Sequence, residues 1–127
     1  MNIPENLRYS KDHEWIAVDG DTATIGITDY AQHSLGDVVY IDLPRAGDKF
    51  GTHEAFGSVE SVKAVSEIFT PVAGEVVEVN DSINDTPEAV NAEPYTDGWM
   101  VKIKMDNPLE ADKMLSPVEY EEYLSSQ

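Results

Sequence analysis

One lysine stands between two short, β-branched stretches of a chain that has only six lysines against 25 acidic residues. Val59 and Val62 precede Lys63, and Val65 and Ile68 follow it. These stretches are too short for a helix and are bounded by glycine and proline, so they predict two strands folded around Lys63. An amine at such a hairpin tip protrudes and can be reached by a modifying enzyme, which suits a covalent tether. The ordinary alternative is a solvated surface lysine.

Three acidic residues, Asp12, Glu14 and Glu67, are a second candidate for chemistry. Paired carboxylates can perform acid–base catalysis when their pKa values are split, so a stand-alone acid–base enzyme is one hypothesis. Carboxylate clusters are, however, expected from composition in so acidic a chain. The three histidines have no zinc-motif spacing, and there is no glycine-rich phosphate loop or Gly-x-Ser-x-Gly segment. The sequence therefore predicts no metal site.

The composition limits both the class of protein and its partners. With 127 residues, 41% of them hydrophobic, the chain suits a single domain, predicted over 1–127. The absence of cysteine excludes disulfides and a thiol nucleophile. A net charge of −17 disfavours nucleic acid and anionic membranes and predicts a monomer that is steered onto basic partners. The N-terminus is neither basic nor apolar, which favours a bacterial cytoplasmic protein.

Short strands separated by turns predict two packed antiparallel sheets. Thr28 and Gly36 are candidate caps of one internal helix, and Ser116 with Glu119 forms a predicted capping box for a C-terminal helix. One helical turn is expected within Pro87–Asn91, and the C-terminal helical segment is predicted over about 108–126. The expected strands are 13–18, 22–27, 37–43, a brief 50–52, the two arms of the hairpin, 74–80 and 99–105.

Several segments, in order along nearly the whole chain, resemble the glycine cleavage system H protein family. The central one is Glu60–Ala64 with Pro71–Asn80, where the family carries lipoic acid in amide linkage on the lysine. The other similar segments are Lys11–Trp15, Ile25–Thr28, Ala31–Gln32, Leu35–Val39, Leu43–Pro44 and Gly98–Lys104.

The resemblance implies a fold, a cofactor and a set of partners. The fold is a mostly β barrel-sandwich hybrid of the lipoyl and biotinyl type, with Lys63 bearing the lipoyl group. The function is a shuttle in glycine catabolism that performs no catalytic step itself. It carries an aminomethyl group from glycine decarboxylase (P protein) to aminomethyltransferase (T protein) and presents the dithiol to dihydrolipoyl dehydrogenase (L protein). A lipoate-attaching enzyme is the remaining partner.

The loaded aminomethyl group is a cation that water hydrolyses, so a cleft with a carboxylate near the arm is expected. In the family this holding site uses an acid in a His-Glu-Trp segment, which Glu14 matches, and an acid shortly after the lysine. Glu67 replaces the more common aspartate there, and Asp12 replaces a small hydroxyl residue.

Two alternatives stay open from the sequence. The first is a lipoyl relay, in which Lys63 is modified but the group is handed to 2-oxoacid dehydrogenases rather than loaded. The second is biotin attachment at Lys104, which lies beside Met105 as in biotin carriers. Lys104 is interpreted instead as a residue at a sheet edge that points to solvent.

Overall fold

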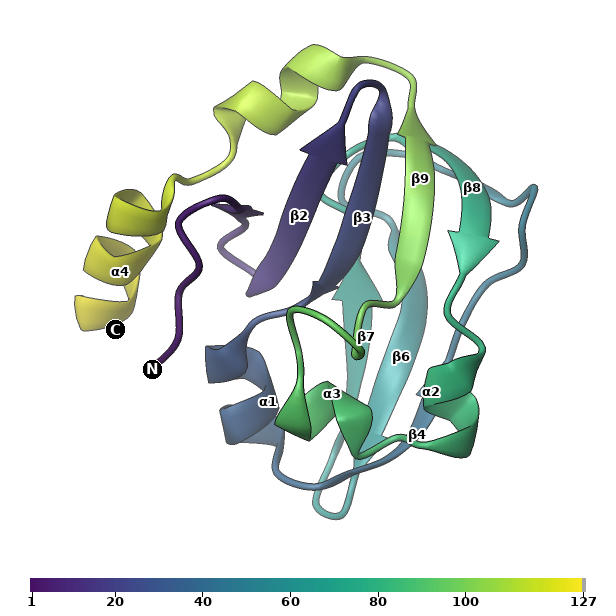
Figure 1. Ribbon diagram of the computed structural model, residues 1–127, viewed down its shortest axis with the longest axis vertical. Coiled ribbons are helices and arrows are strands. Elements are labelled where there is room, and N and C mark those ends of the chain that lie inside the picture. The colour runs from purple at the N-terminus through teal and green to yellow at the C-terminus, as the bar shows by residue number, and fades with distance from the viewer. Residues whose placement is uncertain (127) are drawn as a thin grey trace.

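The computed structural model describes residues 1–126, and these fold into two antiparallel sheets that pack face to face (Figure 1). The first sheet has six strands in the order β1-β2-β3-β9-β8-β5, and the second has three in the order β4-β6-β7. In chain order the strands are β1 Arg8–Tyr9, β2 Glu14–Asp19, β3 Thr22–Ile27, β4 Val38–Asp42, β5 Lys49–Phe50, β6 Ala55–Ser61, β7 Val65–Phe69, β8 Gly74–Val79 and β9 Val101–Met105. The predicted mostly β, two-sheet architecture is confirmed; it is sandwich-like, without a closed barrel.

Alternating apolar residues of both sheets form the main core between the layers. Ile25 and Ile103 come from the large sheet, and Ile41, Val59 and Ile68 from the small one, all at most 5% exposed. Such alternation is the pattern of strands that bury one face and solvate the other. A second cluster under the C-terminal helix contains Leu7, Tyr9, Trp15 and Tyr120.

The internal helix α1, Asp29–Leu35, is bounded by the predicted caps. The Thr28 side chain accepts a hydrogen bond from the Ala31 amide at the first turn. Gly36 ends the helix with φ +80°, a conformation that glycine adopts without a Cβ penalty, and its amide donates to the Gln32 carbonyl. The chain then enters β4 at Val38 directly under the hairpin turn.

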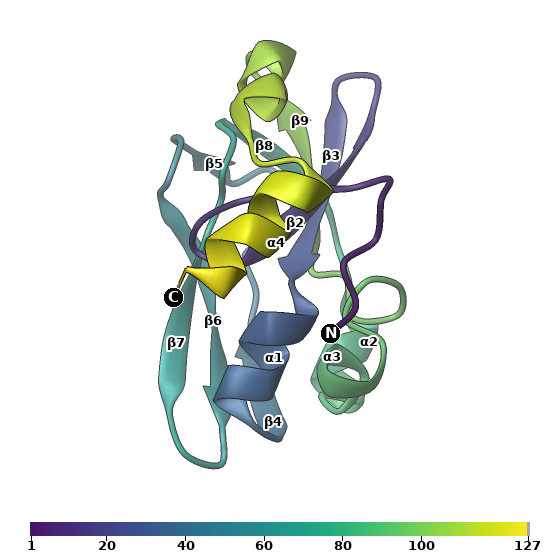
Figure 2. The ribbon, with the colours of Figure 1, turned by 90° about the vertical axis from the view of Figure 1, so that its left-hand side faces the viewer.

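Strands β6 and β7 form the predicted hairpin around Lys63. Their register pairs Glu60 with Val65 and Val59 with Ser66, so the bend falls at 62–64. Across the small sheet, β6 approaches β4 so closely that a Cβ on Gly57 would collide with the Asp42 carbonyl oxygen. The turn protrudes beyond the end of α1 in both ribbon views (Figures 1 and 2).

Two features of the fold differ from the sequence-based predictions. Besides α1, the described residues contain two internal single-turn helices, α2 Ser82–Asp85 and α3 Ala89–Ala92, and only the second was expected as a helical turn. Lys104 does not lie at a sheet edge, because β9 is hydrogen-bonded to β3 on one side and β8 on the other. Its side chain is nevertheless exposed, as expected.

The C-terminal segment covers one side of the large sheet (Figure 2). It consists of a 3-10 helix η1, Pro108–Lys113, followed by α4, Pro117–Ser125. The capping box is present: the Ser116 side chain accepts from the Glu119 amide, and the Glu119 side chain accepts from the Ser116 amide. Across residues 1–126, no helix is long and apolar enough to cross a membrane.

Candidate site at the hairpin lysine

Lys63 is exposed at the bend of the β6–β7 hairpin, as the sequence predicted. Ser61 closes the bend: its amide donates to the Ala64 carbonyl at 2.7 Å. Its hydroxyl oxygen accepts from the amides of Lys63 at 3.3 Å and Ala64 at 3.1 Å. Because Ser61 is itself only 6% exposed, these bonds fix the direction of a turn whose other residues face water.

The turn is tied to the end of α1 and the segment after it. The Val62 amide donates to the Asp37 carbonyl at 3.0 Å. The aliphatic stem of Lys63 lies over Gly36, where an added Cβ would stand 3.4 Å from the lysine Cε. The lysine therefore leaves the molecule over the C-terminal end of α1.

A cavity of about 190 Å³ lies next to this point, between α1, β7 and the segment before β2. Asp12 and Glu67 both line it, so the fold brings together two acids that are 55 residues apart in the chain. Ser34 and Leu35 also line it, and they directly precede Gly36, over which the stem of Lys63 lies. The remaining lining residues are His13, Ile27, Tyr30, Ala31, Ser66 and Ile68. This cavity is mainly apolar, and both of its carboxylate-bearing residues are exposed.

Glu14, the third predicted acid, does not line this cavity but lies buried, with 2% of its surface exposed. Its carboxylate accepts a 2.5 Å hydrogen bond from the Ser10 hydroxyl. The pKa of Glu14 is raised to about 7, mainly by burial and in smaller part by the nearby Asp12. The Ser10 hydroxyl and the Phe69 backbone act in the opposite direction. Glu14 is therefore poised between its neutral and charged forms near neutrality, and its hydrogen-bond partner Ser10 lines a different cavity from the one that Asp12 and Glu67 share.

His13 is a cavity residue that the sequence did not single out. Its backbone adopts φ 69°, and its ring packs 4.5 Å from the Tyr30 ring. Its Nδ1 lies 2.9 Å from the Tyr120 hydroxyl of α4. Burial lowers the pKa of His13, with Asp12 opposing the shift. His13 belongs to the His-Glu-Trp segment, but its sequence neighbours do not indicate its role, because its contacts come from α1 and the distant C-terminal helix.

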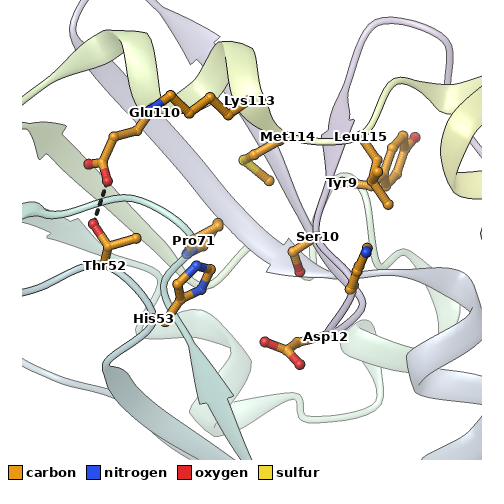
Figure 3. A pocket seen from close by; sticks show the side chains of 11 residues that line it. Tyr9, Ser10, Asp12, Thr52, His53, Pro71, Glu110, Lys113, Met114 and Leu115 are labelled. Carbon is orange, nitrogen blue, oxygen red and sulfur yellow. Dashed lines mark hydrogen bonds between the residues drawn. The ribbon is translucent and has the colours of Figure 1, made fainter.

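A second cavity of about 290 Å³ opens on the other side of Asp12 (Figure 3). Its floor is apolar, with Tyr9, Pro71 and Met114, and its rim carries His53 and Lys113. Glu110 also lines it, but both its carboxylate oxygens are engaged, one by the Thr52 hydroxyl and one by the Ala73 amide. This cavity borders β1 and η1 and does not include the end of α1 over which Lys63 lies.

An exposed lysine at a hairpin bend, on a sandwich of two antiparallel sheets, is the arrangement of the lipoyl- and biotinyl-type carrier domains as a class. Comparison with known sequences is more specific. The family described as Glycine cleavage H-protein matches residues 7–127, and the chain belongs to that family.

Individual relatives agree over almost their full lengths. The chain is 54% identical over 124 residues to the glycine cleavage system H protein of Halothermothrix orenii, covering 98% of this chain and 97% of that one. It is 52% identical to the H protein of Staphylococcus carnosus, covering 98% of each. The crystal structure of a glycine cleavage system H protein from Mycobacterium marinum superposes with a TM-score of 0.85 at 34% identity, covering 98% of both chains.

Proposed function

We propose that this chain is the lipoyl-bearing shuttle of glycine cleavage, with lipoate attached through an amide bond to the Nζ of Lys63. The observation that carries the proposal is the exposed lysine at the bend of a braced hairpin in a member of the H-protein family. The side chain of Lys63 suits this attachment, because its primary amine can form an amide bond with the carboxyl group of lipoic acid. When bound, lipoate supplies a disulfide that can be reduced, carry a group on sulfur and be reoxidised.

The chain's own contribution is to hold and present the arm. Residues 1–127 act as one carrier domain without a catalytic step of their own, in the bacterial cytoplasm and as a monomer. The partners are glycine decarboxylase (P protein), aminomethyltransferase (T protein), dihydrolipoyl dehydrogenase (L protein) and a lipoate-attaching enzyme. Each must reach the same end of the molecule, and the turn protrudes there (Figure 2).

We propose that the cavity of about 190 Å³ beside the end of α1 binds the cationic aminomethyl group that the arm carries. Asp12 and Glu67 line it and provide negative charge, while its apolar walls limit access of water. A unit-charge pair at about 4 Å gains about 4 kcal/mol at an effective dielectric constant near 20, before the cost of desolvation. Glu14 does not line the cavity, but it interacts electrostatically with Asp12, so a change in its protonation adds or removes one negative charge near that residue.

Replacement of the lysine tests the proposal. In cells supplied with lipoate, wild-type protein should gain the mass of a lipoyl group, and Lys63→Arg should not. Lys104→Arg is the matched control, because Lys104 is another exposed lysine on a strand. Lys63→Arg should also leave reconstituted glycine cleavage at background. A lipoyl mass increment and full activity in Lys63→Arg would overturn the assignment.

A further inference from the structure

Asn91, on the single-turn helix α3, uses both ends of its side chain to hold the segment between α1 and β4. Its Oδ1 accepts from the Val38 amide at 2.8 Å. Its Nδ2 donates to the Gly36 carbonyl at 2.9 Å and to Gln32 Oε1 at 3.0 Å. One amide group thus fixes the backbone on both sides of Asp37.

The segment that Asn91 holds is the one on which the lysine turn rests. The Asp37 carbonyl, between the two clamped residues, accepts the Val62 amide at 3.0 Å. Gly36 carries the stem of Lys63 on its open face. A shift of 36–38 would therefore move the point at which the side chain of Lys63 leaves the molecule.

Helix α3 is a firm support for this clamp, although it is only one turn long. Val90, adjacent to Asn91, is fully buried in the main core. Behind the helix, the Gly98 amide donates to the Glu93 carbonyl at 2.8 Å. A Cβ on Gly98 would stand only 2.9 Å from the Ala89 carbonyl oxygen, so the following loop packs tightly against α3.

We propose that Asn91 is a positioning residue for the lysine arm, acting through residues 36–38 on the bend at 62–64. The proposal rests on the proposed attachment at Lys63 for its functional meaning. Whether or not lipoate is attached, the Asn91 side chain should stabilise the hydrogen bond between the Val62 amide and the Asp37 carbonyl. Nothing in the carrier chemistry requires an asparagine at this place, 28 residues after the lysine.

The chain offers a matched control in Asn84. Its Nδ2 donates to the Ile41 carbonyl at 2.7 Å, so it also bonds the backbone of β4, but near the end away from Gly36. Both asparagines tie a short helix to the same strand. A general loss of support for β4 should affect both variants, whereas a loss specific to the lysine turn should follow Asn91 alone.

The experiment compares Asn91→Ala, Asn91→Asp and Asn84→Ala with the wild type. Asn91→Asp keeps the size and the acceptor for the Val38 amide, but it loses the donors to Gly36 and Gln32. Amide hydrogen exchange of unmodified protein should become about tenfold faster at Val62 in both Asn91 variants, relative to amides of β9. Both variants lose the hydrogen bonds from Nδ2 that hold the Gly36 carbonyl and Gln32, so the segment that accepts the Val62 amide is supported less. In Asn84→Ala the Val62 rate should change less than about twofold.

The second measurement is the rate of lipoyl transfer to Lys63 by a purified lipoate-attaching enzyme with its substrates. We expect kcat/KM to fall about tenfold in the Asn91 variants and to stay within about twofold in Asn84→Ala, because a misplaced amine is presented less often in a reactive geometry. Equal Val62 exchange in the Asn91 and Asn84 variants would overturn the positioning role. A wild-type protein that takes up no lipoyl group would instead refute the proposed function and leave the exchange result standing.

Discussion

At the scale of single residues, Glu14 is the least ordinary group in the structure. The residue is only 2% exposed, so burial disfavours the charged form of the carboxyl group and raises its pKa to about 7. The Ser10 hydroxyl offsets part of the cost by donating to it. Since Asp12 interacts with it electrostatically, an uncharged Glu14 also limits the repulsion between these two acids.

The raised pKa of Glu14 predicts how folding stability changes with pH. Between its unfolded value of 4.5 and about 7, the folded state retains a proton that the unfolded state has lost. The Glu14 contribution is therefore fully present below pH 4.5, and stability falls as pH rises through this window, by at most about 3 kcal/mol.

Urea denaturation of wild type and Glu14→Gln at pH 5 and pH 8 measures this contribution. Relative to the wild type, the variant should lose less stability between the two pH values, since glutamine does not titrate. Asp19→Asn, at an exposed strand end, is the control and should keep the wild-type dependence. Parallel pH profiles for wild type and Glu14→Gln would show that Glu14 titrates at an ordinary pKa.

At the scale of elements, helix α4 connects the C-terminus with the cavity beside Lys63. Tyr120 is fully buried and stacks on Tyr9 with ring centroids 4.6 Å apart. Its hydroxyl lies 2.8 Å from the Thr28 hydroxyl, the N-cap of α1, and 2.9 Å from His13 Nδ1. The position of α4 is thereby coupled to both α1 and the cavity lining, although α4 is distant from the lysine in sequence.

Loss of the N-cap of α4 should be measurable as loss of stability. Ser116→Ala leaves the Glu119 amide without its side-chain acceptor and should cost about 1 kcal/mol in urea denaturation. Ser125→Ala is the control at the other end of α4, where the exposed hydroxyl donates to the Glu121 carbonyl. Its effect should stay within about 0.5 kcal/mol. A cost in Ser116→Ala no larger than in the control would mean that the cap does not hold α4 in place.

At the scale of the whole molecule, the main electrostatic feature is a large excess of negative charge. The chain carries 25 acidic against eight basic residues. One ion pair is found among residues 1–126, Lys102 Nζ with Glu78 Oε1 at 3.6 Å, and its side chains are 38% and 57% exposed. Most of the negative charge is therefore uncompensated within the fold, so it repels itself and attracts basic surfaces on partners.

Added salt should act in opposite directions on folding and on association. Raising NaCl from about 20 mM to about 500 mM shortens the Debye length from roughly 20 Å to roughly 4 Å, so the melting temperature should rise as self-repulsion is screened. Over the same range, affinity for a basic partner enzyme should weaken. Calorimetry and titration measure the two effects, and KCl should reproduce NaCl if screening is the cause. A melting temperature that falls with salt, or affinity that is flat, would contradict this account.

The sequence by itself determined the features that depend on neighbouring residues. The alternation around Lys63, the Thr28 cap and the Ser116–Glu119 box are local patterns, and the hairpin bend and the capped helix ends appear where those patterns predicted them. The strand ends differ from the predicted ones by up to two residues, as in β5, which was expected at 50–52 and lies at Lys49–Phe50. The extra turn α2 escaped prediction because it is a single turn within a polar stretch, and its one apolar residue, the buried Ile83, is too little to show a helical period.

Only the tertiary structure decided which of these elements meet. The meeting of Asp12 with Glu67 in one cavity depends on how β7 packs beside the segment before β2. The burial of Glu14 and the contact of His13 with Tyr120 likewise join segments far apart in the chain. Asn91 reaches Val38 across 53 residues. Such contacts follow from packing two sheets and their covering helices around one core, and a period of two or 3.6 residues carries no information about them.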